Sequence, residues 1–386
     1  MAGIAESLGS SHLKFRSVLV LVSACVWLDW KIHQVMPTIR HDPERAIDLD
    51  LVRCTENAAL AAWKWFGKGD KERADAAAVD ALRGMFQLVD CKGLVRIGEG
   101  RKDEAPGIFT DERLGTWKDG SIPMAIAVDP IDGTTLTSRG LPGAISVLAV
   151  ATCKNPDDDP RDLFPAIPSY YMEKIAVGPS VAESSFAVEI DRPIEENLKI
   201  VAAGLNKRVG NLVAVVLDRP RHSEIIEALR RAGCGIRLIS DGDVAAAIAP
   251  SLPNSGVDLY LGVGGSPEAV LSAAAIKCLG GEQLCRMKCR DDNERQRLLS
   301  DEGCTEADFA KVWAVDEMAQ GDHIIFAATG ISDSPMLQGI CYQNRHCTTE
   351  SILVRARNRT VRLIEAHHDI DRKTIRLDSS GEEINI

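Results

Sequence analysis

The sequence predicts an α/β fold, and three observations support this. Strand-like and helical segments alternate through the second half of the chain, which is typical of a largely parallel sheet covered by helices. Residues 124–128 form an unbroken apolar run, as expected of a strand that is buried on both faces. The composition, with 45% apolar and 26% charged residues, is that of an ordinary globular protein.

Length and charge limit the domain organisation and the partners. The 386 residues are enough for two or three domain-sized units. The chain carries 56 acidic and 45 basic residues, a net charge of −11, which argues against nucleic acid or an anionic membrane as the main partner. An anionic small molecule is compatible with this charge if basic side chains converge locally.

The 11 cysteines form no regular framework, and their number is odd, which favours a reduced intracellular setting over a secreted disulfide scaffold. Cys278, Cys285 and Cys289 lie close together in the chain, but their spacing is not that of a zinc-binding pair. We therefore expect no structural zinc site.

Residues 1–42 are set apart as an N-terminal extension. Lys14 and Arg16 precede an apolar run over residues 18–28, which is too short to span a bilayer. The run is compatible with a signal-peptide core, while the basic, serine-containing and acid-poor leader also fits an organellar transit peptide. A dispensable extension is the third reading, and the cysteine usage disfavours export.

The first structured segment is expected to hold two helices and a strand. A helix from residue 50 should end at Gly67, and a second should run from 71 to about 90. Lys71 and Asp75 lie four residues apart at the edge of the apolar side of this second helix. They either form an ion pair on the surface or point towards the interior. A strand over 94–97 then leads into a loop where Glu99, between two glycines, can approach a ligand closely.

The most informative stretch is 124–135, where the apolar strand gives way to D-P-I-D-G-T-T. Asp129 and Asp132 leave the end of this strand together, and Thr134 adds a hydroxyl beside them. Grouped hard oxygen ligands suit Mg²⁺ or Mn²⁺, which usually share a substrate phosphate. The alternative is an ordinary acidic turn.

The middle of the chain predicts more strands and a boundary. Residues 143–152 should form a buried strand, and residues 170–177 and 181–190 resemble paired strands. A helix should run from Pro193 to about residue 205. Polar and basic residues then interrupt the apolar pattern, so we place subdomains at 43–205 and 206–386.

In the second subdomain we expect loops of functional character at the ends of strands. The strands are predicted at 212–217, 236–239, 257–263 and 324–328, and the helices at 224–232, 244–249 and 267–279. Ligands gather at the carboxyl ends of strands in such sheets. The loop at 218–222 carries arginines whose planar guanidinium groups suit phosphate oxygens. The loop at 264–268 leads into a helix, with Ser266 expected as N-cap and Pro267 at the first helical position, and a helix start favours anions. Glu268 is either a ligand or a residue that balances the helix dipole.

Several of these motifs together resemble a known family. D-P-I-D-G-T resembles the metal motif of the Mg²⁺-dependent, lithium-sensitive sugar and inositol phosphatases. Six further motifs, in the same order along the chain, are similar to those of class II fructose-1,6-bisphosphatase. The sequence of residues 218–244 is especially similar to that of the cyanobacterial type, which also accepts sedoheptulose 1,7-bisphosphate. These motifs are G-D-K-x-x-A-D at 69–75, I-G-E-G-x-x-D-E-A-P at 97–106, Y-M-E-K at 171–174, R-P-R-H at 219–222, D-G-D-V at 241–244 and G-G-x-P-E at 264–268.

The resemblance implies a layered sugar-phosphatase fold of two packed α/β subdomains with mixed sheets covered by helices. It also implies roles for residues that match the family motifs. One metal ion would be held by Asp75 and Glu99, and another by Asp129, Asp132 and Glu268, although family members often carry glutamate at the position of Asp132. The catalytic group would comprise Asp103, Thr134 and Lys71. Substrate contacts would come from Asp132, Gly133, Thr134, Tyr171, Arg219, Pro220, Arg221, Asp241, Gly242, Asp243 and Gly265.

The resemblance further implies Mn²⁺- or Mg²⁺-dependent hydrolysis of the 1-phosphate of fructose 1,6-bisphosphate, in gluconeogenesis or the Calvin cycle. Sedoheptulose 1,7-bisphosphate is a second possible substrate. An inositol monophosphatase-like activity and a non-catalytic sugar-phosphate-binding protein are the alternatives. We expect a homo-oligomer, a dimer or a tetramer, with no nucleic-acid or membrane partner. It should lie in the cytoplasm, or in the chloroplast stroma if residues 1–42 are a transit peptide.

Overall fold

The structure is a computed structural model that describes residues 43–99, 107–155 and 157–385. Residues 44–386 form one compact unit. This unit contains all the elements below apart from the first residue of α2. Among the described residues, no helix has the length and apolar character needed to cross a membrane.

The first sheet has eight strands in the order β12-β13-β11-β4-β3-β1-β2, with β14 paired to β13. Among the described strands of this sheet, only β1 and β3 pair in parallel. The strands are β1 Cys91–Ile97, β2 Arg113–Leu114, β3 Ile122–Asp132, β4 Ile145–Thr152, β11 Ile324–Gly330, β12 Cys341–Gln343, β13 His346–Arg355 and β14 Val361–Asp369.

The strand expected at 124–128 is confirmed as part of β3, and its two faces enter different cores. Met124 and Ile126 pack with the helices α2 (Pro43–Trp63) and α3 (Lys71–Phe86). Ala125 and Ala127 point to the opposite face, because side chains alternate along a strand. Both faces are covered, which explains the unbroken apolar run.

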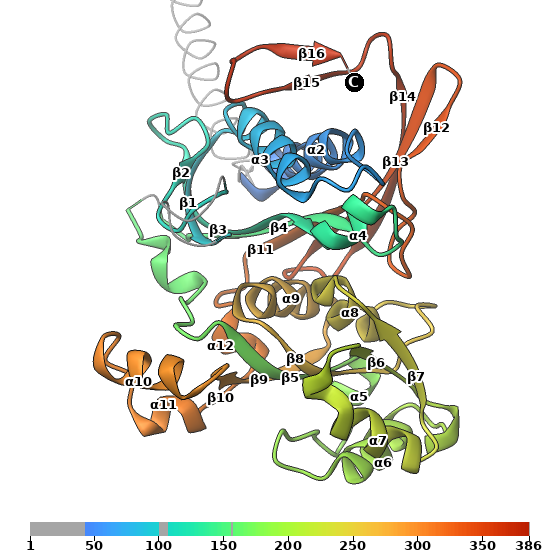
Figure 1. Ribbon diagram of the computed structural model, residues 1–386. Helices are drawn as coiled ribbons and strands as arrows, with labels where there is room; N and C mark the ends of the chain where they lie inside the picture. The colour runs from blue at the N-terminus through green and yellow to red at the C-terminus, as the bar shows by residue number, and fades with distance from the viewer. Residues whose placement is uncertain (1–42, 100–106, 156, 386) are drawn as a thin grey trace, which may run out of the picture. The chain divides into compact units, whose positions relative to one another are not determined.

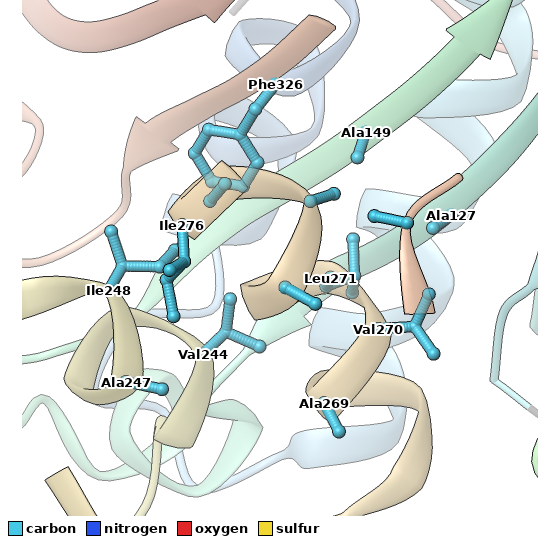
Figure 2. Packing of buried hydrophobic residues seen from close by; sticks show 14 of the residues in the cluster. Ala127, Ala149, Val244, Ala247, Ile248, Ala269, Val270, Leu271, Ile276 and Phe326 are labelled. Carbon is cyan, nitrogen blue, oxygen red and sulfur yellow. The ribbon is translucent and has the colours of Figure 1, made fainter. Parts of the chain in front are cut away.

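Two helices rich in small residues lie between the two sheets, as Figure 1 shows. These are α8 (Asp243–Ile248) and α9 (Ser266–Leu279). In Figure 2, Ala127 and Ala149 of the first sheet lie in the same cluster as Val270 and Leu271 of α9. The short strand side chains allow this helix to approach the sheet closely, so the start of α9 is held firmly near the end of β3.

The second sheet has six strands in the order β10-β9-β5-β8-β6-β7, and it is mixed. Only β6 pairs in parallel, with β7 and with β8, among the described strands of this sheet. The expectation of a largely parallel sheet is therefore wrong, whereas the α/β class with mixed sheets is confirmed. The strands are β5 Tyr171–Val177, β6 Val213–Leu217, β7 Gly235–Ile239, β8 Leu259–Gly265, β9 Glu282–Lys288 and β10 Val312–Trp313.

A strand expected at 181–190 is not formed. β5 is already paired on both sides, with β8 and with β9, so it has no free edge for a further strand. The chain instead turns into the short helix α5 (Pro179–Ala182), with proline in its first turn. The other face of the second sheet is covered by α6 (Ile194–Gly204) and α7 (Ser223–Arg231).

The chain passes between the two sheets more than once, and the subdomain boundary between 205 and 206 stays a prediction. β5 already belongs to the second sheet, and β11 returns to the first, where it pairs antiparallel with both β4 and β13. The remaining elements are α4 Thr134–Arg139, α10 Asp292–Ser300, α11 Glu306–Ala310, α12 Val315–Met318, β15 Thr374–Arg376 and β16 Glu383–Asn385.

A buried ionic network joins α2 to the C-terminal strands. Lys373 Nζ donates to Glu56 Oε2 at 3.1 Å, and Thr349 Oγ1 donates to Glu56 Oε1 at 3.1 Å. Burial by itself would raise the pKa of Glu56, but the hydrogen bond with His368 and the charge of Lys373 outweigh it and lower the pKa from 4.5 to about 2.

This network predicts a loss of stability in acid. A carboxyl group whose pKa falls on folding stabilises the protein above its unfolded pKa, and this contribution is lost as pH falls from about 4.5 towards 2. The charge contributes about 3 kcal/mol at neutral pH. Urea unfolding of the wild type and of Glu56→Gln should differ by about this free energy at pH 7, and the difference should shrink as pH approaches 3. A constant difference across this range would contradict the prediction.

Candidate active site

One large cleft, with a volume of about 1080 Å³, collects most of the expected site residues. The ends of β1 and β3, the start of α4 and the start of α9 all open into it. Its lining includes Glu99, Asp129, Asp132, Gly133, Thr134, Tyr170, Tyr171, Asp241, Asp243, Gly265, Glu268, Arg290 and Arg297. The cleft therefore brings together loops that are far apart in the sequence.

The end of β3 places two carboxyl groups in the cleft. The pairing of β3 with β4 changes register between Asp129 and Asp132, so the strand bulges where it carries them. Asp129 Oδ1 accepts a hydrogen bond from the Ile131 amide at 3.0 Å, and Asp132 Oδ2 accepts one from the Ala245 amide at 3.3 Å. Gly133 has a φ of 101°, which favours glycine at this turn into α4.

Asp75 on α3 joins this group through Thr134. The Thr134 hydroxyl donates to Asp75 Oδ1 at 3.1 Å. Lys71 Nζ donates to Thr135 Oγ1 at 2.7 Å, and it forms no ion pair with Asp75 within the described residues. The surface ion pair considered from the sequence is therefore wrong, and both side chains connect α3 to the start of α4.

Glu99 and Glu268 lie on the other sides of the cleft. Glu99 Oε2 accepts a hydrogen bond from the Ile108 amide at 3.3 Å. Glu268 stands in the first turn of α9, whose N-cap is Gly265 rather than the expected Ser266. A Cβ atom at position 265 would lie 1.9 Å from Glu268 Oε2, so glycine leaves the room that this carboxylate occupies.

The carboxyl groups raise one another's pKa. Burial first, and neighbouring carboxylates second, raise the pKa of Asp129 and Asp132 well above the usual aspartate range. Burial likewise raises the pKa of Asp75 to about 6 and that of Glu268 to about 7. The pKa of Glu99 is also raised, first by desolvation and then by the charge of Asp75. A bound cation would relieve this repulsion.

The donor set fits a hard divalent cation. All five side chains offer oxygen, which suits Mg²⁺ or Mn²⁺. Glu268 Oε2 is buried and accepts no hydrogen bond within the part of the chain that the structure describes. Among those same residues, no three acidic, histidine or cysteine side chains stand close enough to hold one ion as they are. Ligation would draw these carboxylates together from their present positions.

The expected substrate residues separate into two groups. Tyr171, Asp241, Asp243 and Gly265 line the cleft. Arg219, Pro220, Arg221 and Gly242 do not line it. Arg221 stacks on Tyr171: its guanidinium carbon lies 5.1 Å from the ring centroid, and its Nε and Nη2 donate to the Val263 carbonyl at 3.2 and 2.8 Å.

His222 holds in place the loop at residues 218–222, which carries Arg219 and Arg221. The sequence analysis missed this role. Its Nδ1 lies 2.7 Å from the Leu217 carbonyl, and its Nε2 accepts a hydrogen bond from the Val263 amide at 2.8 Å. This pair requires the neutral ring protonated on Nδ1. Burial lowers the pKa of His222, in agreement with that form. Its place within R-P-R-H was the available signal.

Lys174 is a second residue that the sequence analysis left without a role. It is fully buried on β5, and its Nζ donates to Asp243 Oδ2 at 2.8 Å. Asp243 is therefore partly engaged within the protein, which leaves its other oxygen for a ligand. A lysine inside an otherwise buried strand, Y-M-E-K-I-A-V, was the available signal.

Asp103, which we propose as the base, lies outside the described residues. The described chain resumes at Gly107, and a Cβ atom at position 107 would lie 2.8 Å from Glu99 Oε2. Gly107 therefore lies beside Glu99.

Comparison with known proteins matches this chain to one family over most of its length. The family model for bacterial fructose-1,6-bisphosphatase, glpX-encoded, matches residues 45–368. The chain is 39% identical to fructose-1,6-bisphosphatase 1 class 2 of Escherichia coli (strain K12) over 338 residues, which cover 85% of this chain and 97% of that protein. The class 2 fructose-1,6-bisphosphatases of Escherichia coli O6:H1 and of Shigella flexneri show the same identity and coverage.

Proposed function

This chain belongs to the bacterial, glpX-encoded fructose-1,6-bisphosphatase family, and we propose that the acidic cleft is the place where its reaction occurs. The enzyme is a phosphoric monoester hydrolase that converts fructose 1,6-bisphosphate into fructose 6-phosphate and phosphate. The observation that carries the proposal is the gathering of acidic groups: four of the five candidate ligands line one cleft, and Asp75 is bonded to Thr134 in its lining.

The acidic groups are suited to two divalent ions. We assign Asp75 and Glu99 to one ion and Asp129, Asp132 and Glu268 to another. When bound, such ions neutralise the phosphate charge and lower the pKa of the attacking water. Either Mn²⁺ or Mg²⁺ fits the all-oxygen donor set. The raised pKa values support this assignment, because carboxylates that repel one another gain most from a shared cation.

The proton transfers fall to the residues around Thr134. A hydroxyl group has one proton and two acceptor positions. Since the Thr134 hydroxyl donates to Asp75, it remains an acceptor for the attacking water. We propose that Thr134 orients this water, that Asp103 takes its proton, and that Lys71, bonded to the neighbouring Thr135, supports the phosphate side of the site.

Arg221 does not itself line the cleft but stacks on Tyr171, which does, and we propose that these two residues bind the phosphate that is not hydrolysed. Replacing Arg221 by alanine should raise KM by roughly 10- to 100-fold with little change in kcat, because a charge-assisted hydrogen bond to bound substrate is lost. Lysine should rescue KM only in part, since it lacks the planar fork. Steady-state kinetics of both variants test this, and unchanged KM values would remove the loop from the substrate site.

Release of phosphate from three substrates tests the function itself. We expect hydrolysis of fructose 1,6-bisphosphate with Mn²⁺ or Mg²⁺, and we include sedoheptulose 1,7-bisphosphate because residues 218–244 resemble the type that accepts it. Inositol monophosphate should be a poor substrate, because its recognition would rest on D-P-I-D-G-T alone. Faster hydrolysis of inositol monophosphate would contradict the proposal, and metal binding without any hydrolysis would favour a sugar-phosphate-binding protein.

The wider setting follows from the family and from the composition. We propose a role in gluconeogenesis, or in the Calvin cycle if the sedoheptulose ester is used. We further propose a cytoplasmic homo-oligomer, a dimer or a tetramer. If residues 1–42 act as a transit peptide, the location would be the chloroplast stroma, and fusing them to a reporter protein would show whether they direct import.

A further inference from the structure

The wall of the cleft formed by Tyr170, Arg290 and Arg297 has no role in the reaction described above. All three side chains line the same cleft as the acidic groups. Tyr170 comes directly before β5, with its side chain 49% exposed, while Arg290 follows β9 and Arg297 belongs to α10. The two arginines of this wall therefore bring positive charge to a cleft that is also lined by acidic side chains.

The buried carboxylate of Glu294 holds Tyr170 and Arg290 of this wall in place. Glu294 is 3% exposed, and its Oε1 accepts a hydrogen bond from the Tyr170 amide at 2.8 Å. Its Oε2 accepts one from the Arg290 amide at 2.7 Å and lies 3.4 Å from Arg290 Nε. Asp291 caps α10 by accepting from the Glu294 amide at 2.8 Å. One side chain thus fixes Tyr170 and Arg290 relative to each other.

The two arginines lie on the Tyr170 ring, and they differ in what else they bind. The guanidinium carbon of Arg290 is 3.9 Å from the ring centroid, and that of Arg297 is 5.5 Å away. Arg297 Nη1 is paired with Glu302 at 3.0 Å. The terminal amino groups of Arg290 donate to no group among the described residues, so they are available to a ligand in the cleft.

The same pattern occurs on the neighbouring residue. Arg221 lies over the Tyr171 ring, but its guanidinium is bonded to the Val263 carbonyl and does not line the cleft. A substrate with two phosphates must enter a cleft lined by carboxylates, in a protein whose net charge is −11. Planar guanidinium groups fixed on an aromatic ring are well suited to phosphate oxygens.

We propose that Arg290, held on Tyr170 by Glu294, forms a further phosphate-binding subsite of this cleft, in addition to the phosphate contacts assigned to the metal ions and to Arg221. The inference rests on the proposed reaction. Its ligand is a phosphate dianion, which comes either from the bisphosphate substrate or from free inorganic phosphate. The positive charge of this subsite offsets the repulsion between the carboxylates that line the cleft and an anionic ligand.

The test compares Arg290→Gln with Arg295→Gln in the Mn²⁺-loaded enzyme. Arg295 is the matched control, because it belongs to α10, stacks on Phe309 at 4.3 Å and does not line the cleft. Three quantities are measured: KM and kcat for fructose 1,6-bisphosphate, and the dissociation constant of inorganic phosphate by calorimetry. Arg290→Gln should weaken one of the two phosphate interactions by roughly 10- to 100-fold, and Arg295→Gln should change neither.

The outcomes separate the two sources of phosphate. A raised KM with kcat preserved assigns the subsite to the substrate, and weaker phosphate binding at unchanged KM assigns it to the free anion. Arg290→Lys should recover part of either loss, because it restores charge without the fork. KM and phosphate affinity within twofold of wild type in Arg290→Gln would overturn the proposal. The phosphate titration remains informative even if the wild type proves inactive, so the failure of this subsite and that of the proposed function are distinguishable.

Discussion

Replacing Glu268 by glutamine should lower activity at limiting Mn²⁺ by at least about 100-fold, because changes merely next to metal ligands already cost 10- to 100-fold. The amide keeps the shape of the side chain and removes only its charge. High Mn²⁺ should recover part of the activity by mass action. The melting temperature of the metal-free variant should not fall, since burial first, and the neighbouring carboxylate of Asp243 second, raise the pKa of Glu268 to about 7 and disfavour its charged form.

Glu224→Gln is the matched control for this experiment. Glu224 stands in the first turn of α7, as Glu268 does in α9, but it does not line the cleft. If Glu268 only balanced the dipole of its helix, both variants would lose a few tenths of a kcal/mol of stability and keep their activity. Normal turnover of Glu268→Gln at low Mn²⁺ would therefore remove Glu268 from the metal site.

Replacing Asp103 by asparagine should lower kcat by about 10²- to 10⁴-fold, while Mn²⁺ affinity and KM stay close to wild type. The amide is nearly the same size as the carboxylate but cannot accept the proton of the attacking water, and a general base contributes about this factor. The Thr134 hydroxyl would still hold the water, because its bond to Asp75 does not involve Asp103.

The competing role for Asp103 is to anchor its loop by local hydrogen bonds. In that case the asparagine variant would keep much of its turnover and would show a lower melting temperature instead. Measuring kcat, KM and melting temperature on one preparation separates the two roles. Substantial turnover of Asp103→Asn would rule out the assignment as base.

The parts of the site that the sequence predicts are those set by local structure. The buried strand, the turn at Asp132-Gly133 and the helix start before Glu268 are each encoded within a few residues, so the positions of these carboxylates follow from the chain itself. Among the described residues, Asp129, Asp132, Glu99 and Glu268 line one cleft, and their role as metal ligands stays a prediction.

The parts that the sequence could not predict depend on pairing between distant segments. Residues 181–190 have a strand-like pattern, but β8 and β9 already occupy both edges of β5. The strand expected at 324–328 was placed with the strands of the second subdomain, but β11, which contains it, pairs in the first sheet with β4 and β13. Arg290 and Tyr170 are 120 positions apart by number, and they are brought together by the pairing of β5 with β9 and by the hydrogen bonds of Glu294.

The most direct test of the account is a Mn²⁺ titration of the whole protein, by calorimetry, for the wild type and for Asp129→Asn. Asp129 interacts with Asp132, Glu99, Glu268 and Asp75, so it lies at the centre of the carboxyl groups that we assign to metal binding. We expect the wild type to bind Mn²⁺ and Asp129→Asn to bind it at least about 100-fold more weakly, with its fold retained. Equal Mn²⁺ affinity in the two proteins would show that this cleft is not the metal site.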